Sequence, residues 1–315
     1  MTSSSPEIAV VGAGVAGASA AYRLTELGFK SRVYEAEGRP GGRMAATVIN
    51  EAVFDHGAQF FTTRGHKFRS AVDTAAADGA VKVWTHGFDE PPDGYERWRG
   101  VPDMTALASW LLSKADVTVH FDQPVDHLKR LNASAIVLTP PVPLSLALAQ
   151  RSNLEPPEML LNKLRNVEYK RTIAVLFPLE EHPESLPSHG GIQFLDDPAL
   201  AFITDNATKG VSDSPAVTVH LSNDASVALW NEPDHELTEF ASKHLEANIG
   251  AFVSLGSVVK RWRYAGPVQV LEELAFVWGK RPFIAMAGET FNGPKVEGAF
   301  DSGRYAAEKI AEFLS

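Results

Sequence analysis

The chain has 315 residues, of which 44% are hydrophobic and 22% are charged, and its net charge is −10. This profile is typical of a globular protein long enough for about two domains, and the negative charge argues against binding nucleic acid or an anionic membrane. Cysteine is absent, which excludes disulfides, iron–sulfur clusters, thiolate nucleophiles and any group attached through a cysteinyl sulfur. We expect a soluble protein, since no apolar stretch is long enough to span a bilayer, and the absence of cysteine fits a cytoplasmic one.

The strongest pattern lies in residues 8–35. An apolar, β-branched run opens it and predicts a buried parallel strand. Glycines then follow in the spacing G-x-G-x-x-G, at Gly12, Gly14 and Gly17, and a helical pattern and a second strand lead to Glu35. In this pattern the glycines permit a tight turn, a close approach to a pyrophosphate and close helix packing, and the terminal acid suits ribose hydroxyls. The pattern predicts a dinucleotide-binding fold; a glycine-rich turn in another α/β protein is the alternative.

Two further segments suggest a backbone that lies against a ligand. Residues 36–44 contain a double glycine followed by Arg43, which indicates backbone and a cation beside a phosphate, or else a surface turn. Residues 54–63 start like a strand and break at two small residues, and Gln59 follows with an amide donor and acceptor. We expect His56 to form a local hydrogen bond, because none of the ten histidines has metal-ligand spacing. No metal site is predicted.

The middle of the chain contains alternating short elements. Pro, Gly and acids predict a loop over 87–100. Three prolines within 139–143 exclude helix and central strand there and indicate a rigid crossing to another domain. Helices are predicted at 68–80 and 104–112 and strands at 117–121 and 135–138.

The second half is rich in strands that predict one antiparallel sheet, hence a second domain; they lie at 173–177, 191–195, 201–205 and 216–221. An amphipathic helix is expected over 234–252. In a strand at 258–264, Trp262 and Tyr264 would share one face, opposite Arg261 and Arg263. The pattern is equally compatible with aromatic side chains in the hydrophobic core and with aromatic side chains in the wall of a substrate cavity. Near the end, a strand at 284–287 precedes a small-residue turn at 298–303 and a last helix at 304–314, again an anion-binding arrangement.

Several of these motifs together resemble the amine-oxidase-like flavoproteins. They are the glycine fingerprint with its acid, Gly-Gly-Arg at 41–43, Gly-Ala-Gln-Phe at 57–60, Val-Leu-Thr-x-Pro-Val-Pro at 137–143 and the closing glycine-rich helix. Within that superfamily, renalase and its bacterial relatives are the most similar. The resemblance rests on Gly-Ala-Gln-Phe at 57–60, Thr-x-Pro-Val-Pro at 139–143 and Arg-Trp-Arg at 261–263. The resemblance is strong at both ends of the chain and thin from about 145 to 255. Unlike most of the superfamily, the chain has no room for a long hairpin insertion between residues 125 and 137.

The resemblance implies an α/β fold: a Rossmann-like FAD-binding domain with a parallel sheet, of the glutathione-reductase type, and a smaller α+β substrate domain with an antiparallel sheet. The expected FAD-binding domain is discontinuous and comprises 6–65, 101–145 and 268–315. The expected substrate domain comprises 66–100 and 146–267.

The resemblance also implies non-covalent FAD. Ala13 to Ala16 and the acid at 35 would hold the adenosine half, Arg43 the pyrophosphate, and Glu289 with the 298–299 turn the ribityl chain and pyrimidine edge. The residues expected at the cofactor are Gly12, Ala13, Gly14, Val15, Ala16, Gly17, Glu35, Ala36, Gly42, Arg43, Met44, Gly57, Ala58, Gln59, Phe60, Val125, Gly288, Glu289, Gly298 and Ala299. The residues expected at the substrate and the flavin face are Gln59, Phe60, Trp262 and Tyr264.

The implied activity is that of a renalase-like oxidase. Its substrate would be an aberrant dihydronicotinamide dinucleotide, an isomer of NAD(P)H, which is oxidised to NAD(P)+ while O2 gives H2O2. A flavin amine oxidase, or a related oxidase or desaturase of another small molecule, is the first alternative. A flavin-binding protein without turnover is the second. No nucleic-acid or membrane partner is expected.

Overall fold

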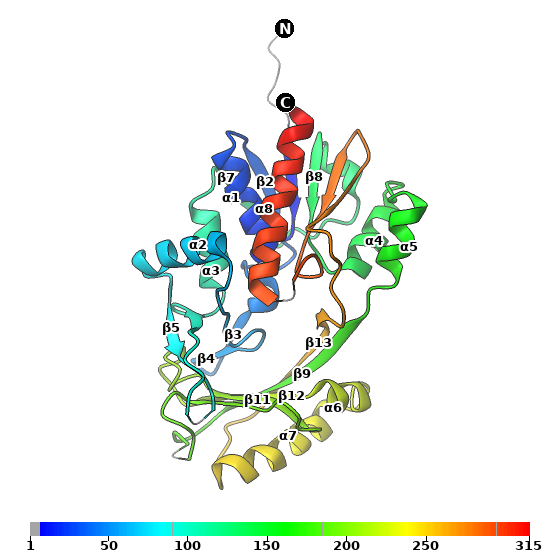
Figure 1. Cartoon of the computed structure of the whole chain (residues 1–315). Helices are drawn as coiled ribbons and strands as arrows, with labels where there is room; N and C mark the ends of the chain where they lie inside the picture. The colour runs from blue at the N-terminus through cyan, green and yellow to red at the C-terminus, as the bar shows by residue number, and fades with distance from the viewer. Residues whose placement is uncertain (1–6, 90, 184, 294) are drawn as a thin grey trace.

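The computed structural model describes residues 7–89, 91–183, 185–293 and 295–315. Its elements are arranged around two larger sheets. The six-stranded sheet occupies the upper part of the molecule in Figure 1, and the five-stranded sheet lies below it with two helices beneath.

The six-stranded sheet has the order β14-β15-β8-β1-β2-β7, and all neighbours are parallel except β14 and β15. Its central strands consist almost entirely of apolar residues, because helices cover both faces of the sheet. This confirms the predicted α/β class with a parallel sheet. The strands are β1 (Ile8–Val11), β2 (Ser31–Tyr34), β7 (Val117–His120), β8 (Ala135–Leu138), β14 (Phe276–Trp278) and β15 (Phe283–Met286).

Alternate residues of β1 serve two separate cores. Ile8 and Val10 pack in the core of one face, and Ala9 and Val11 pack in the core of the other, as the two-residue period of a strand requires. On the first face lie α1 (Val15–Glu26), α2 (His66–Ala77), α3 (Ala106–Ser113) and α8 (Lys295–Leu314); on the second lie η2 (Leu128–Leu131), α4 (Val142–Arg151) and α5 (Glu158–Arg165).

The first and last helices of the chain pack closely side by side, as Figure 1 shows for blue α1 and red α8. A Cβ at Gly303 would lie 2.1 Å from the carbonyl oxygen of Ala16, so only glycine permits this approach. The Ser19 hydroxyl also donates to the carbonyl oxygen of Phe300 at 2.6 Å. The chain therefore closes on itself at this helix pair.

The five-stranded sheet is antiparallel in the order β10-β11-β12-β9-β13, which confirms the predicted second sheet. One face packs against α6 (Asn223–Ala228) and α7 (Asp234–Ile249). The other face meets β4, through residues such as Ala52 and Phe54. The strands are β9 (Tyr169–Pro178), β10 (Gly191–Gln193), β11 (Leu200–Asp205), β12 (Ala216–Leu221) and β13 (Val258–Pro267).

Two short hairpins lie between the sheets, and one of them corrects the sequence prediction. The first pairs β3 (Ala46–Ile49) with β4 (Ala52–Asp55), directly after η1 (Gly42–Met44). The second pairs β5 (Val81–Thr85) with β6 (Arg97–Gly100). The predicted loop over 87–100 is wrong over its last four residues, because buried Trp98 adds a strand that also exchanges backbone hydrogen bonds with Phe61.

The structure also corrects two helix predictions. The prolines at 139–143 do not exclude a helix, since α4 begins at Val142 with Pro143 in its first turn, where a missing N–H breaks no intrahelical bond. Moreover, α4 and α5 pack on the six-stranded sheet, so β9 and not the proline segment leads to the second sheet. The last helix begins at Lys295 and not at 304. The division of the chain into two functional domains stays a prediction.

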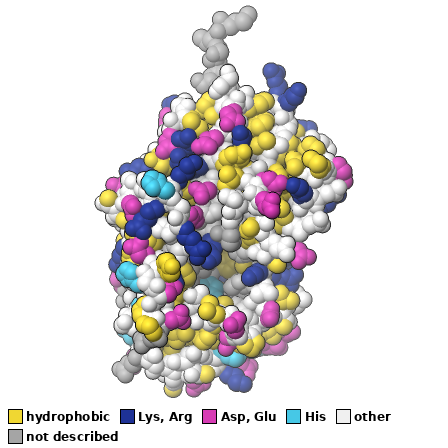
Figure 2. Space-filling model, in the orientation of Figure 1, with side chains coloured by type: hydrophobic (Ala, Val, Ile, Leu, Met, Phe, Trp, Pro, Cys, Tyr) yellow, Lys and Arg dark blue, Asp and Glu magenta, His cyan; other side chains and the backbone are white. Residues whose placement is uncertain are grey.

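The surface view shows one face of the molecule with a hollow between its upper and lower parts, beside which lie Lys and Arg side chains (Figure 2). None of the helices in the described ranges combines the length and apolar character that a bilayer crossing requires.

Candidate functional site

The first glycine turn lies at the carboxyl end of β1. Gly12 has a φ of +99°, and a Cβ there would lie 2.5 Å from the Thr139 hydroxyl oxygen. A Cβ on Gly17 would lie 1.9 Å from the carbonyl oxygen of Gly12. α1 follows at once, and no side chain caps its N-terminus. Its first N–H groups therefore lack intrahelical acceptors at the edge of the sheet.

Glu35 lies beside this turn, at the end of β2, and is 8% exposed. One carboxylate oxygen accepts from the Ala13 N–H at 2.7 Å, and the other accepts from the Glu37 N–H at 3.1 Å. The loop after β7 also reaches this point, because the Gln123 N–H donates to the carbonyl oxygen of Glu35 at 2.9 Å. Val125, two residues further, packs partly buried at the edge of the second core.

The second glycine turn is joined to the first. The Gly41 N–H donates to the carbonyl oxygen of Ala13 at 3.1 Å. The Arg43 guanidinium then forms a two-pronged ion pair with the Glu289 carboxylate and donates to the carbonyl oxygen of Tyr264 at 3.3 Å. Two residues that lie 246 apart in the sequence thus meet on one side of the turn.

The segment at 55–57 is held by side chains from several elements. The Gln59 amide donates to the carbonyl oxygens of Asp55, at 2.8 Å, and of Gly57, at 3.0 Å. The carbonyl oxygen of His56 accepts from the Trp262 indole N–H at 2.8 Å and lies 3.0 Å from His220 Nε2. These contacts hold the 55–57 backbone against the five-stranded sheet.

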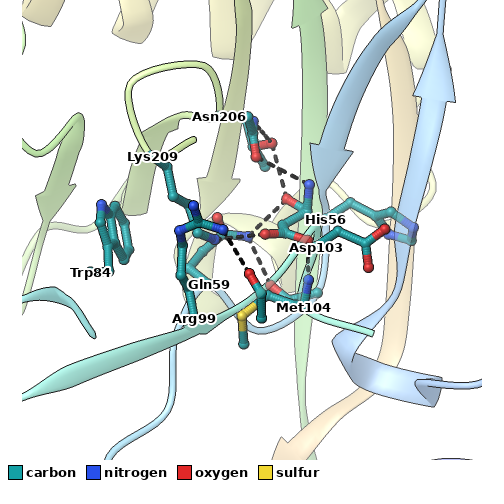
Figure 3. Close-up of polar contacts among 12 residues, drawn as sticks. His56, Gln59, Trp84, Arg99, Asp103, Met104, Asn206 and Lys209 are labelled. Carbon is teal, nitrogen blue, oxygen red and sulfur yellow. Dashed lines mark hydrogen bonds and ion pairs between the residues drawn. The ribbon is translucent and has the colours of Figure 1, made fainter. Parts of the chain in front are cut away.

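Asp55 joins the three elements that surround this segment. One carboxylate oxygen accepts from the Met104 N–H at 2.9 Å, and the other pairs with the Lys209 ammonium at 2.8 Å. Both side chains of this ion pair are fully buried. Figure 3 shows Lys209, Arg99 and Asn206 pointing toward the middle of this network. Burial lowers the pKa of Lys209, and the Asp55 carboxylate opposes that shift.

Two histidines of the site are held in the neutral form. His56 stacks on Trp262, with ring centroids 5.3 Å apart, and His220 lies on β12. Burial lowers the pKa of each to about 4, and for His56 the charge of Lys260 adds to the effect. The Nδ1 atoms of both rings and Oε1 of Gln59 are buried without a hydrogen-bond partner among the described residues.

An aromatic cluster surrounds Phe60. Its ring lies 5.1 Å from that of Phe88 and 6.1 Å from that of Phe202. The Arg97 guanidinium lies 5.7 Å from the centre of the Phe60 ring. Phe60 thus belongs to a wall built from β6, β11 and the loop between the hairpin strands.

A cavity of about 320 Å³ opens where β9 and β13 diverge. Burial along β13 alternates as the predicted facing requires, with Trp262 and Tyr264 partly buried and Arg261 and Arg263 exposed, and the pairing of β13 with β9 shifts register between Trp262 and Gly266. Arg263 and Tyr264 both line the cavity. Its lining is Pro143, Val167, Tyr169, Arg171, Arg263 and Tyr264.

At the C-terminal side, the Gly288 N–H donates to the Ser302 hydroxyl at 2.9 Å, which ties the end of β15 to α8. Gly298 lies in the first turn of α8, and a Cβ there would lie 1.8 Å from the carbonyl oxygen of Gly293. The Glu297 carboxylate accepts from the Gly65 N–H at 2.5 Å. The first turn of α8 thus carries an acid of its own, which the anion-binding prediction for this helix did not include.

The structure brings most predicted cofactor residues together along the carboxyl edge of β1, β2 and β15. Those in the two glycine turns, at 57–60 and at 288–289 are linked by the contacts above. Ala36 and Gly42 are exposed at the same edge, Met44 is buried below it, and Ala299 is half-buried in α8. Sequence reasoning missed the residues that hold the 55–57 segment from a distance, namely Asp55, Asn206, Lys209, Thr218 and His220. A polar residue inside an otherwise apolar strand, as at 218 and 220, is a signal from which two of them could have been found.

Comparison with known proteins finds the same fold and one short stretch of closer similarity. Residues 10–75 match the model of a family described as an NAD(P)-binding Rossmann-like domain. The chain is 40% identical over 70 residues to protoporphyrinogen oxidase 2, chloroplastic/mitochondrial, of Arabidopsis thaliana, which is 22% of this chain and 14% of that protein. The matched segment is thus only a small part of the relative's length.

Solved structures match along nearly the whole chain. A candidate protoporphyrinogen oxidase from Exiguobacterium sp. 255-15 superposes with a TM-score of 0.73 at 13% identity, covering 98% of this chain and 99% of that one. Cyclohexylamine oxidase from Brevibacterium oxydans IH-35A superposes with a TM-score of 0.70 at 13% identity, with the same coverage of both chains. The chain therefore shares the fold of this group of oxidoreductase structures.

Proposed function

We propose that this chain is an FAD-dependent oxidoreductase that oxidises a small molecule and holds FAD without a covalent bond. The observation that carries the proposal is an unbroken series of contacts. It runs from Glu35 through Ala13 and Gly41 to Arg43, and on to Glu289 and the Gly57–Phe60 backbone. This is the order in which ribose, pyrophosphate, ribityl chain and flavin ring follow one another in FAD.

The residues present suit that cofactor. The uncapped N-terminus of α1 favours a phosphate, and at Gly14 a Cβ would have no neighbour closer than 3.9 Å, so the backbone is open to a ligand. Arg43 uses three of its N–H groups on Glu289 and Tyr264, which leaves two for a pyrophosphate oxygen. The unpartnered Oε1 of Gln59 is an acceptor for an N–H group of the ring or of the substrate.

When bound, FAD accepts a hydride from the substrate, and O2 then takes up two electrons and two protons to give H2O2. The side chains of the protein would orient the cofactor and the substrate and enclose them. The 57–60 segment supports one side of the ring, and Phe60 and Trp262 exclude water from the reacting side. We further propose that 6–65, 101–145 and 268–315 form the cofactor part, and 66–100 and 146–267 the substrate part.

For the substrate, we propose an aberrant dihydronicotinamide dinucleotide, as in renalase-like oxidases. The motifs at 57–60, 137–143 and 261–263 support this choice. Two neutral histidines beside the site are also consistent with a substrate that carries an uncharged carboxamide. A flavin amine oxidase is the second candidate, because cyclohexylamine oxidase has the same fold over the whole chain.

The test mixes purified, FAD-loaded protein without oxygen with isomerised NADH and, separately, with cyclohexylamine and putrescine. We expect the dinucleotide isomers alone to bleach the visible flavin absorption, and H2O2 to appear when air is admitted. Bleaching by the amines alone would replace the renalase-like proposal with the amine oxidase one. No bleaching by either would favour a flavin-binding protein without turnover.

The cofactor itself is tested by acid precipitation of the yellow protein. Non-covalent FAD is expected in the supernatant, identified by chromatography against authentic FAD. A colourless protein that takes up no FAD on reconstitution would sink the flavoenzyme proposal, and a yellow pellet would show covalent attachment.

A further inference from the structure

The cavity between β9 and β13 is lined by positive charge from two arginines. Arg171 and Arg263 both line it, and none of its six lining residues is an acid. Neither guanidinium forms an ion pair within the described part of the chain. By contrast Arg261, on the same strand as Arg263, pairs with Asp234 of α7 at 2.6 Å. The two cavity arginines are thus available to a ligand.

The other walls of the cavity are aromatic and fixed. The rings of Tyr169 and Tyr264 meet edge to face with their centroids 5.3 Å apart. The Tyr169 hydroxyl lies 2.8 Å from the Thr290 hydroxyl and accepts from the Val142 N–H at 3.0 Å. Arg171 is itself supported, since its guanidinium lies 4.9 Å from the centre of the Trp230 ring. Little side-chain freedom remains to be lost when a ligand binds.

The cavity also adjoins the proposed cofactor site. Tyr264, which lines it, accepts a hydrogen bond from Arg43 through its carbonyl oxygen. Tyr169 is bonded to Thr290, the residue after Glu289. The negative charge of Glu289 is already matched by Arg43 and does not neutralise the cavity arginines. An anion that reaches Arg171 and Arg263 would therefore lie near the residues assigned to the cofactor.

We propose that this cavity takes the anionic group, a carboxylate or a phosphate, of a substrate with a planar ring, with Arg171 and Arg263 as the residues that determine specificity. Guanidinium groups bind both anions through paired N–H donors, and the two tyrosine rings suit a flat ring beside the anion. The inference rests on the proposed function for its placement at a substrate site. It disfavours cationic amines, since two unpaired arginines repel them.

Titration calorimetry of the FAD-loaded protein tests this with four ring compounds: phenyl phosphate, benzoate, benzyl alcohol and benzylamine. We expect the first two to bind and the last two to bind at least about tenfold more weakly, as for loss of one charge-assisted hydrogen bond. The relative affinities of phenyl phosphate and benzoate show whether the cavity prefers a phosphate or a carboxylate. Equal binding of benzyl alcohol and the anions would overturn the proposal.

The variants Arg171→Gln and Arg263→Gln are each expected to weaken anion binding about tenfold or more, while binding of benzyl alcohol stays unchanged. Lys170→Gln is the matched control: it removes one charge from the same strand, is exposed, and lies on the opposite face from Tyr169 and Arg171. Circular dichroism verifies that each variant folds. If Lys170→Gln weakens binding as much, the arginines act only through net charge and the specific site is refuted.

The FAD content of the wild-type protein and of the arginine variants distinguishes a failure of this proposal from a failure of the proposed oxidoreductase function. If the arginine variants lose FAD but keep anion binding, the cavity belongs to the cofactor and the substrate assignment is wrong. If the wild-type protein binds no FAD, the oxidoreductase proposal fails. The calorimetry with FAD-free protein still decides whether the cavity selects anions, because it needs no flavin signal.

Discussion

Glu35 is a buried carboxylate whose two oxygens accept from the backbone at Ala13 and Glu37. In the proposed function it also holds the ribose of FAD. Glu35→Gln keeps the shape and removes the charge, so we expect about tenfold or more weaker FAD binding, the range for a hydrogen bond to a charged group. Fluorescence titration of the FAD-free protein measures this. The exposed neighbour variant Glu37→Gln is the control, and equal affinities for all three proteins would count against the role of Glu35.

His220 makes stability depend on pH. Its pKa of about 4 in the folded protein lies below the ordinary 6.5, so the unfolded chain binds a proton that the folded chain does not. The stabilisation is complete above about pH 6.5 and is lost as the pH falls toward 4. Urea unfolding at about pH 7.5 and about pH 5 should show a loss that is smaller in His220→Gln by on the order of 2 kcal/mol. An identical loss in both proteins would show that another group is responsible.

At the scale of elements, the ion pair of Asp55 and Lys209 fastens β4 to the turn between β11 and β12 with both side chains fully buried. Lys209→Met leaves the carboxylate buried without its partner, so we expect the free energy of unfolding to fall by about 3–5 kcal/mol. The exposed pair of Lys163 and Glu273 supplies the control, because Lys163→Met should cost about 1 kcal/mol or less. Urea titration measures both, and similar costs would mean that burial does not govern the Asp55 pair.

The elements also show what the sequence could predict. The strands at 8–11 and 135–138 are predictable because each is a short apolar run, rich in β-branched residues, that helices cover on both faces. β6 was missed, since Arg97 and Arg99 resemble solvent-exposed residues although Arg99 is 2% exposed. The start of α8 was placed nine residues too late, because Gly298 and Gly303 resemble a turn and are in fact close-packing positions inside a helix.

The candidate site likewise has one part that the sequence predicts and one part that it does not. Its glycine turns and Gly57–Phe60 have local motifs and were found from them. Asp55 and Lys209 lie 154 residues apart, and no local sequence pattern around either residue predicts that they form an ion pair. The cavity that Arg263 lines lies where β13 pairs irregularly with β9, and such pairing is not visible along one strand. Contacts made by tertiary pairing are the part that the sequence did not reveal.

At the scale of the whole molecule, the 55–57 segment links the five-stranded sheet, through Trp262 and His220, to η1 and the second glycine turn. A ligand held by the upper sheet and by this segment should therefore stabilise both sheets together. With FAD at about 100 times its dissociation constant we expect about 2.7 kcal/mol. Thermal unfolding followed by circular dichroism and by tryptophan fluorescence should shift upward by the same number of degrees. A shift in only one signal would show that the sheets unfold separately, and ADP serves as the partial-ligand control.

The pairing of α1 with α8 has a consequence for biosynthesis. Residues 12–19 are synthesised long before residues 300–303, so Ser19 and Ala16 remain without their contacts to Phe300 and Gly303 until that later segment has been made. A nascent chain that ends before residue 288 has neither Glu289 for Arg43 nor the helix that covers α1. In the proposed function, FAD is therefore held firmly only after residues 288–303 have been synthesised. Ribosome-bound chains stalled before residue 288 should retain no FAD on sedimentation, whereas released chains that contain residues 288–315 should.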